Sequence, residues 1–329
     1  MDSTQLLAVA ERNGGYFTRG QALDCGYSDR DLREATRAGF LTRLRHGTYA
    51  LTSAYSILDA SGRHRVRARS VVDKLGPGLA LSHTSACAAW ELDHFGTPLE
   101  TVHVTRLDGA TGRREAGVTY HVGAIDESEV REVDGRLIVH TARAVVEHAT
   151  ISSIESAMVC TSSALRMGVT TEAELVDTLQ PFGRWQGGRK ASIAIGLSDG
   201  LCETVGEVRS LHLCWREALP RPELQYRVTT ASGIVVARTD FAWPDHRHLG
   251  EFDGLVKYGR LNPYTDDPGR AITDEKLRED LARAQQFGMS RWVWAGLDTR
   301  RAAATANAIR AGMELSKTLY LRNRTTIVL

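Results

Sequence analysis

Several classes of protein are excluded by what this sequence has little of. It carries five cysteines, at positions 25, 87, 160, 202 and 214, and none forms a Cys-x-x-Cys pair or a zinc-type spacing. We therefore expect reduced, buried thiols and a cytoplasmic protein. No apolar run is long enough to cross a bilayer, and the Met-Asp-Ser-Thr start lacks the basic residues and apolar core of a signal peptide, so we expect no membrane partner.

An excess of charge of one sign is also missing. The 41 basic and 40 acidic residues leave a formal net charge of +1, which excludes a strongly basic, non-specific nucleic-acid coat. Glycine-rich phosphate loops and dinucleotide motifs are absent too, which weighs against nucleotide-driven chemistry. The length of 329 residues, with 42% apolar and 25% charged residues, predicts two or three globular domains. Any contact with nucleic acid must then come from local patches.

Acidic residues gather on two adjacent predicted strands in the C-terminal half. The run Val236-Ala-Arg-Thr-Asp-Phe-Ala-Trp243 alternates apolar and polar side chains, and the turn formers of residues 244–248 reverse the chain. The second strand begins in Leu249-Gly-Glu-Phe-Asp-Gly-Leu-Val-Lys257. Because the two strands form a hairpin, we expect Asp240 of the first strand and Glu251 of the second to converge.

Further acids and a lysine surround this hairpin. Asp253 shares the strand parity of the second acid, and Glu203 and Glu207 lie one turn apart on a predicted helix that precedes the hairpin. Clustered carboxylates are costly to desolvate unless a cation neutralises them, and oxygen ligands are those that Mg²⁺ or Mn²⁺ prefers. Lys257 would stabilise charge developing on a phosphate. The alternative is a solvated acidic face paired with nearby arginines.

The order of predicted elements over residues 201–297 is helix, three strands, helix and a final strand at 290–297. With its acids, this segment resembles the PD-(D/E)XK nuclease superfamily, in the branch similar to very-short-patch repair endonucleases that is common in actinobacterial proteins. The resemblance implies a restriction-endonuclease-like α/β domain. It also implies that Asp240 is the metal-binding acid after the first strand, Glu251 the second acid and Glu207 the acid of the preceding helix.

The segment departs from the superfamily pattern at two positions. A lysine usually follows the second acid by two residues, but Asp253 stands there, so the lysine's role falls to Lys257 or Lys276. The Ser-Pro-x-Glu-Ser entry common to this branch is replaced by Thr204-Val-Gly-Glu-Val208. These departures leave two alternatives open, an active nuclease and a nuclease fold that only binds nucleic acid.

The first 52 residues predict a winged helix-turn-helix. Thr18-Arg-Gly-Gln21 and Ser28-Asp-Arg-Asp31 begin the second and third of three short helices, and residues 39–50 alternate as two strands with a turn at His46-Gly47. Basic residues on the third helix and the wing are the candidate DNA contacts, against the alternative of a solvated helix face: Arg30, Arg33, Arg37, Arg43, Arg45 and His46. Through Gly47-Thr-Tyr-Ala50 the segment resembles the N-terminal domain of AbiEi-type antitoxins. That family implies double-stranded DNA as the partner and, in many members, repression of the gene's own promoter.

Residues 53–190 predict a small α+β connecting domain with a glycine-containing linker near 181–190. We expect this domain to hold the two ends apart or to form a homodimer. Its histidines have no metal-like spacing, so structural or surface roles are expected for His83, His94, His103, His121, His140 and His148.

The sequence thus predicts an α+β multidomain chain with a winged helix in 1–52, the connecting domain in 53–190 and a PD-(D/E)XK nuclease-like domain in 191–329. Its predicted function is DNA binding coupled to a Mg²⁺- or Mn²⁺-dependent endonuclease, in phage defence, toxin–antitoxin function or DNA repair. The alternative is an AbiEi-like regulator whose nuclease fold is inactive. A third possibility is an antitoxin that acts by contact with a cognate toxin.

Overall fold

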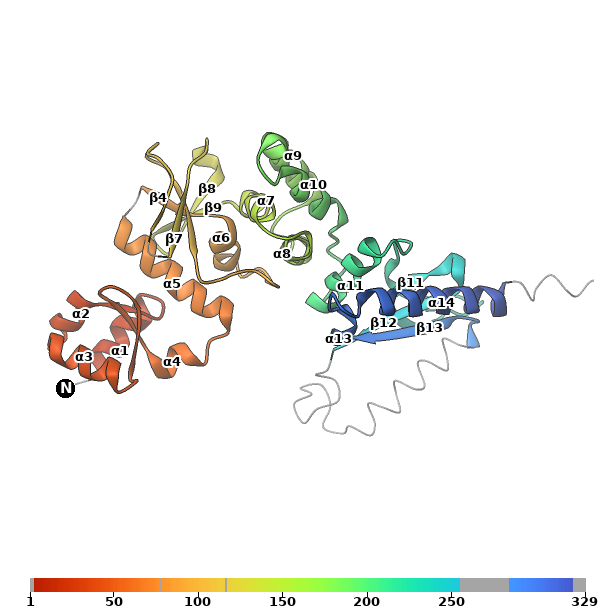
Figure 1. The fold of residues 1–329 in the computed structure, drawn as a ribbon, viewed down its shortest axis with the longest axis horizontal. Coiled ribbons are helices and arrows are strands. Elements are labelled where there is room, and N and C mark those ends of the chain that lie inside the picture. The colour runs from red at the N-terminus through yellow and green to blue at the C-terminus, as the bar shows by residue number, and fades with distance from the viewer. Residues whose placement is uncertain (1–2, 77, 116, 255–283, 322–329) are drawn as a thin grey trace, which may run out of the picture. The chain divides into compact units, whose positions relative to one another are not determined.

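The computed structural model describes residues 3–76, 78–115, 117–254 and 284–321 (Figure 1). The chain divides into two compact units, Met1–Gly196 and Leu197–Leu329. Both units mix helices with sheets, so the chain is of the α+β type. Among the described residues, no helix is long and apolar enough to cross a membrane.

The first unit begins with a three-helix, three-strand arrangement that is winged-helix-like. Its small sheet has the strand order β1-β3-β2, and all its pairs are antiparallel. The elements are α1 (Ser3–Arg12), β1 (Phe17–Thr18), α2 (Arg19–Asp24), α3 (Asp29–Arg37), β2 (Leu41–Arg45) and β3 (Thr48–Leu51).

Local sequence explains where these elements start. Thr18 and Ser28 each form a capping box that satisfies N–H groups at the start of α2 and α3, as predicted. Gly47, with φ of +70°, provides the left-handed backbone in the β2–β3 turn. Apolar residues from helices and strands then close a small core, including the fully buried Phe17 and Leu32.

The rest of the first unit is built on a mixed six-stranded sheet of order β6-β7-β5-β4-β9-β8. Two pairs, β5 with β7 and β4 with β9, are parallel, and the others are antiparallel. The strands are β4 (Leu79–Leu81), β5 (Val102–Arg106), β6 (Arg113–Glu115), β7 (Val118–His121), β8 (Val130–Val133) and β9 (Arg136–Val139).

Helices that come before, between and after these strands in the chain pack with the sheet into one apolar core. Within it, α7 is buried over residues 141–150. Such complete burial is typical of a helix enclosed on all sides. The helices are α4 (Thr52–Ser56), α5 (Ala60–Leu75), α6 (His83–Ala89), η1 (Glu127–Glu129), α7 (Thr141–Ile151), α8 (Ile154–Arg166), α9 (Glu172–Leu179), η2 (Gln180–Arg184) and α10 (Gly188–Leu197).

The linker predicted near 181–190 differs from the structure. Helices η2 and α10 occupy this stretch, and Phe182 is buried in the core of the first unit. Two glycines of this stretch allow close packing, because a Cβ atom on Gly187 would lie 1.9 Å from the Thr150 carbonyl oxygen and one on Gly188 would lie 2.2 Å from the Phe182 carbonyl oxygen. The division between the units lies further along, after Gly196.

The second unit is a four-stranded sheet of order β10-β11-β12-β13 with helices packed on it. Strands β10, β11 and β12 are antiparallel, whereas β13 is parallel to β12. The elements are α11 (Val205–Arg216), β10 (Glu223–Thr229), β11 (Val235–Trp243), η3 (Pro244–His246), β12 (His248–Asp253), β13 (Gly288–Val293), α13 (Trp294–Leu297) and α14 (Ala302–Tyr320).

The predicted helix, three strands and final strand are present in this unit, but the last strand ends early. It stops at Val293, and residues 294–297 turn into α13 instead of extending the strand. Trp292 is buried against Phe241, which anchors the strand to the core before the turn. The helix predicted from Thr273 lies outside the described residues.

Candidate functional site

Helix α3 exposes a pair of arginines on one face of the N-terminal domain. Arg33 and Arg37 are four residues apart, so their side chains project from the same side of the helix. Both are exposed, and neither makes a hydrogen bond or ion pair with a residue that the structure describes. Arg30, by contrast, donates to Glu34 at 2.8 Å. Two of the three predicted cations on α3 are therefore available to an external partner.

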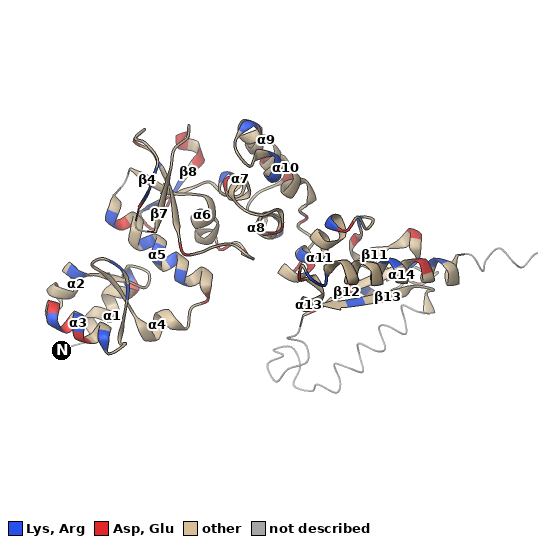
Figure 2. Ribbon diagram, in the orientation of Figure 1, with Lys and Arg blue, Asp and Glu red and all other residues tan. Residues whose placement is uncertain are grey.

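The other two acids on α3 also have partners within the protein. Asp29 receives two hydrogen bonds of 2.6 Å from Arg19, and this contact holds the pKa of Asp29 below its usual value. Asp31 accepts from the backbone and hydroxyl groups of Ser28 in the capping box, which lowers its pKa as well. Figure 2 shows acidic and basic residues mixed along α3. Because each acid has its own partner, the charges of the unpaired arginines are not offset by a direct contact.

The wing contributes fewer free cations than the sequence predicts. Arg43 and His46 are exposed on β2 and at the β2–β3 turn. Arg45 is half-buried, and its Nη1 atom is enclosed without a hydrogen-bond partner among the described residues. On the other side of the turn, the ammonium group of Lys74 lies 3.5 Å from the carbonyl oxygen of His46.

The acids predicted in the second unit meet at the start of the sheet pairing between β11 and β12. Asp240 precedes Phe241, which pairs with Gly250, and its Oδ2 atom accepts a hydrogen bond of 2.9 Å from the Phe252 N–H. Glu251 stands between those two β12 residues, so the first and second predicted acids are neighbours across the hairpin.

Glu207 joins this group from α11. Burial raises the pKa of its carboxyl group, and the nearby charge of Asp240 raises it further. Three donors oppose this effect: the Glu203 N–H at 2.8 Å, the Thr204 hydroxyl at 2.8 Å and the Gln225 amide at 3.0 Å. The structure therefore brings Glu207, Asp240 and Glu251 to one region.

Arginines neutralise part of this acidic region. Arg291 on β13 lies 3.0 Å from Glu251, opposite it in the parallel register, and Arg238 pairs with Glu203 at 2.7 Å. Asp253, two residues beyond Glu251, is half-buried at the end of β12. Within the described ranges, no three histidine, cysteine or acidic side chains are arranged to hold a metal ion. Both candidate lysines, 257 and 276, lie outside those ranges.

Comparison with known proteins identifies the N-terminal domain. Residues 5–52 match the family described as transcriptional regulator, AbiEi antitoxin. Two curated relatives, the uncharacterized proteins MT2308 and Rv2248 of Mycobacterium tuberculosis, are each 30% identical to the chain over 181 residues. That alignment takes in 53% of this chain and 64% of each relative, so the chain spans less than two thirds of their length.

One solved structure also resembles the chain. It is the crystal structure of the Rv2827c protein from Mycobacterium tuberculosis, with a TM-score of 0.36 and 14% sequence identity. The similarity covers 69% of this chain and 88% of that chain.

A cluster of histidines in the first unit was not anticipated from the sequence. His83, His103 and His121 come from α6, β5 and β7, and their rings stack on one another. Their separations of 18 and more residues give no metal or catalytic spacing. The sequence gives one weak indication of the cluster. His103 and His121 each lie in a segment that alternates apolar and polar residues, and these two segments form the neighbouring parallel strands β5 and β7.

Proposed function

We propose that this chain is a DNA-binding transcriptional regulator of the AbiEi antitoxin kind, whose N-terminal winged helix binds double-stranded operator DNA. The observation that carries the proposal is the arrangement of charge on α3. Each of its acids is held by a residue of the protein, whereas Arg33 and Arg37 make no hydrogen bond or ion pair with the described residues. The match of residues 5–52 supports the proposal, because that family is described as a transcriptional regulator.

The geometry fits recognition by a helix in the major groove. In winged helix-turn-helix proteins the recognition helix contacts base edges, while a wing contacts the phosphate backbone. In this chain, α3 would supply Arg33 and Arg37 to the groove, and Arg43 and His46 would lie near the phosphates. The formal net charge of only +1 means that affinity would depend on these local contacts.

Binding to a labelled duplex from upstream of the chain's own gene tests the proposal. Arg33→Ala and Arg37→Ala should each weaken specific binding by about 1–3 kcal/mol, as expected for an arginine contact with a base. A change confined to phosphate contacts would instead reduce the salt dependence by about one unit of slope. Fluorescence anisotropy over a range of salt concentrations measures both quantities.

Arg30→Ala is the matched control, because Arg30 is exposed on the same helix but paired with Glu34. It should leave affinity close to that of the wild type. If the Arg33 and Arg37 variants bind specific and scrambled duplexes as the wild type does, the winged-helix interface is assigned wrongly.

A metal-dependent endonuclease of the PD-(D/E)XK type is a second candidate for residues 197–329. The convergence of Glu207, Asp240 and Glu251 favours it, because carboxylate oxygens are the ligands that Mg²⁺ and Mn²⁺ prefer. However, Arg291 already pairs with Glu251, and the described acids do not form a group of three metal ligands. The site as described does not fit a metal ion, so we assign no hydrolytic step to one.

Incubation with supercoiled plasmid separates the two candidates. A nuclease should nick the plasmid with Mg²⁺ or Mn²⁺ but not with a chelator, and Asp240→Ala should abolish nicking while leaving DNA affinity unchanged. Asp245→Ala serves as the control, since Asp245 is an exposed acid on the same hairpin. Cleavage by the Asp240→Ala protein would contradict the nuclease assignment, and an intact plasmid with shifted mobility would support the regulator alone.

The antitoxin description also raises two partners besides DNA. A cognate toxin and a second copy of this chain are both consistent with the proposal. Co-purification of the chain with the product of an adjacent gene, and light scattering of the pure chain, test them separately.

A further inference from the structure

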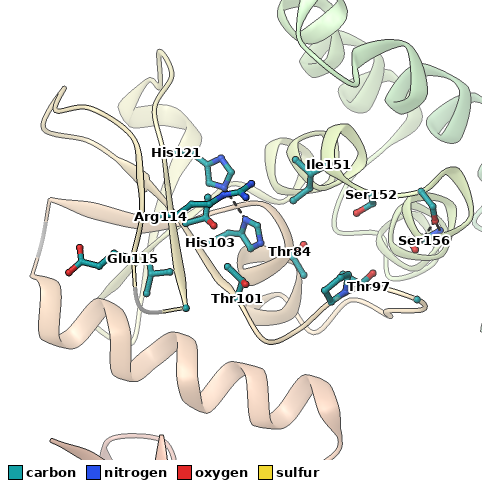
Figure 3. Close-up of a pocket in the computed structure, with 16 residues that line it drawn as sticks. Thr84, Thr97, Thr101, His103, Arg114, Glu115, His121, Ile151, Ser152 and Ser156 are labelled. Atoms are coloured by element: carbon teal, nitrogen blue, oxygen red, sulfur yellow. Dashed lines mark hydrogen bonds between the residues drawn. The ribbon is translucent and has the colours of Figure 1, made fainter. Parts of the chain in front are cut away.

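The first unit contains a cavity of 590 Å³ on the six-stranded sheet, well away in sequence from the proposed DNA contacts (Figure 3). Its walls come from β5, β6 and β7, from α6 and from the start of α8. The volume lies within the range of pockets that hold small molecules, about 300–1,000 Å³. Its lining mixes imidazoles, hydroxyls, one arginine and one acid, Glu115, with apolar side chains.

Two histidines in this cavity form a hydrogen-bonded pair. His103 Nδ1 lies 2.9 Å from His121 Nε2, and the His121 ring stacks on buried His83 with centroids 3.6 Å apart. Burial lowers the pKa of His103 to about 3 and that of His121 to about 4, so both rings are neutral at neutral pH. A neutral imidazole has one N–H and one acceptor nitrogen. Whichever ring donates the shared proton, the pair retains one further N–H group for a ligand.

Arg114 supplies the positive charge of this cavity. It lies on β6 next to the two histidines (Figure 3). Burial is the largest cause of the low pKa of His103 and His121, and the charge of Arg114 lowers both values further. Arg114 makes no hydrogen bond or ion pair with any residue that the structure describes. Its neighbour Arg113, in contrast, pairs with Glu115 at 3.0 Å and lies over the Tyr120 ring.

The opposite wall offers hydroxyls and an apolar surface. Thr84, Ser152 and Ser156 line it. The Ser156 hydroxyl accepts a hydrogen bond of 2.9 Å from Ser153, and the Thr84 and Ser152 hydroxyls lie 3.0 and 3.1 Å from Nδ1 of His148. Ile151, at the end of α7, adds apolar surface to this wall, and Val118 of β7 adds apolar surface on the side of the histidines. A ligand would thus meet the Arg114 guanidinium and an imidazole N–H at one end, where the Glu115 carboxylate also lines the cavity but is paired with Arg113. At the other end it would meet neutral groups.

We propose that this cavity binds a small anionic molecule whose phosphate or carboxylate group sits on Arg114 and the His103–His121 pair. An oxyanion is the chemistry that matches an unpaired guanidinium beside a neutral N–H donor. The remainder of the molecule packs against the wall that carries the hydroxyls and Ile151. This site is separate from the surface of α3 and the wing, so it does not rest on the proposed DNA binding.

Calorimetric titration of the full chain with inorganic phosphate, adenosine monophosphate and acetate tests the proposal and separates a phosphate site from a carboxylate site. At least one of these probes should saturate at millimolar concentration and shift the imidazole nitrogen resonances of His103 and His121. Arg114→Ala should weaken that binding by about tenfold or more, the effect of losing one charge-assisted hydrogen bond.

Two control variants locate the effect. Arg106→Ala removes an arginine of β5 that is paired with Asp108 and does not line the cavity, and the double variant Arg33→Ala, Arg37→Ala removes the cations of α3. Both should bind the probe as the wild type does. The proposal is overturned if none of the three probes binds, if Arg114→Ala binds as tightly as the wild type, or if the α3 double variant loses binding.

Discussion

At the scale of single residues, Arg143 and Glu147 form an ion pair in the interior of the first unit. The guanidinium donates to Glu147 at 2.8 Å, to Glu129 at 2.6 Å and to the carbonyl oxygen of Ala124 at 2.9 Å. Burial raises the pKa of Glu147, and the charge of Arg143 opposes that rise. The carboxylate also accepts from the His83 N–H at 3.3 Å, directly beneath the histidine cluster.

Removing the arginine should therefore be costly. Arg143→Met leaves Glu147 buried without its cation, so we expect the free energy of unfolding to fall by about 3–5 kcal/mol. Urea unfolding measures the loss. The double variant Arg143→Met, Glu147→Gln should recover much of it, because the acid that then remains without its arginine, Glu129, is partly exposed to solvent and not enclosed like Glu147. Equal losses in the single and double variants would show that packing, and not charge, sets the cost.

At the scale of secondary-structure elements, α11 packs against β12 through a position where only glycine fits. A Cβ atom on Gly206 would lie 1.9 Å from Cε1 of the Phe252 ring. We expect Gly206→Ala to destabilise the second unit by about 1–3 kcal/mol, the usual cost of overpacking. Gly196→Ala in α10 is the control, since nothing lies within 4 Å of the Cβ position of Gly196. The stability of this variant should be at least that of the wild type, because alanine favours a helix more than glycine does. Thermal unfolding distinguishes the two, and similar melting temperatures would contradict the close packing.

Elements whose start is coded locally could be predicted from the sequence. The capping boxes at Thr18 and Ser28 place α2 and α3, and the alternation of residues 236–243 places β11 together with its acid. Arg291 was not foreseen as the partner of Glu251, because their contact depends on a parallel register between distant strands. The nuclease-like assignment of residues 191–329 remains a prediction.

The histidine-lined cavity could not be predicted for a similar reason. Its two central imidazoles belong to β5 and β7, which are neighbours only in the folded sheet. A periodicity argument uses residues within one element, so it gives no information on contacts between strands whose pairing is unknown. In the sequence, Arg114 is only one of two adjacent arginines. The structure distinguishes them, because Arg113 forms an ion pair with Glu115 whereas Arg114 lines the cavity.

At the scale of the whole molecule, buried histidines predict a loss of stability in mild acid. Burial lowers the pKa of His64 to about 4, below the unfolded value of about 6.5. Between these values the unfolded chain binds a proton that the folded chain does not, so stability falls as pH falls. For His64 alone the cost is about 1.4 kcal/mol per pH unit. The pKa is also lowered by burial, with the same effect on stability, at six further histidines: His83, His94, His103, His121, His148 and His248.

Urea unfolding at several values between pH 7 and pH 5 should show this decline. His64→Gln removes one of the groups that bind a proton on unfolding. The slope of the free energy of unfolding against pH should therefore fall by up to the amount due to one proton, whatever the effect of the change on absolute stability. A stability that stays level over this range would mean that the imidazoles are accessible to protons in the folded chain.

The winged-helix-like domain is also tied to the rest of its unit. Asp73 on α5 accepts hydrogen bonds from the Tyr16 hydroxyl and from Arg136, the latter at 2.7 Å, and Arg136 donates to the carbonyl oxygen of Asn13 at 3.2 Å. Gly15 packs so closely on α5 that a Cβ atom there would lie 2.9 Å from Val66.

The segment that a family comparison delimits is thus not a self-contained physical module. Cutting the chain after residue 52 would strand the Tyr16 hydroxyl without its acceptor and uncover the turn that α5 shields. A chimeric protein that takes over the winged-helix-like domain would therefore have to include α5 and Asp73. One designed from the family boundary alone would expose the surface that α5 covers and leave the Tyr16 hydroxyl without its acceptor.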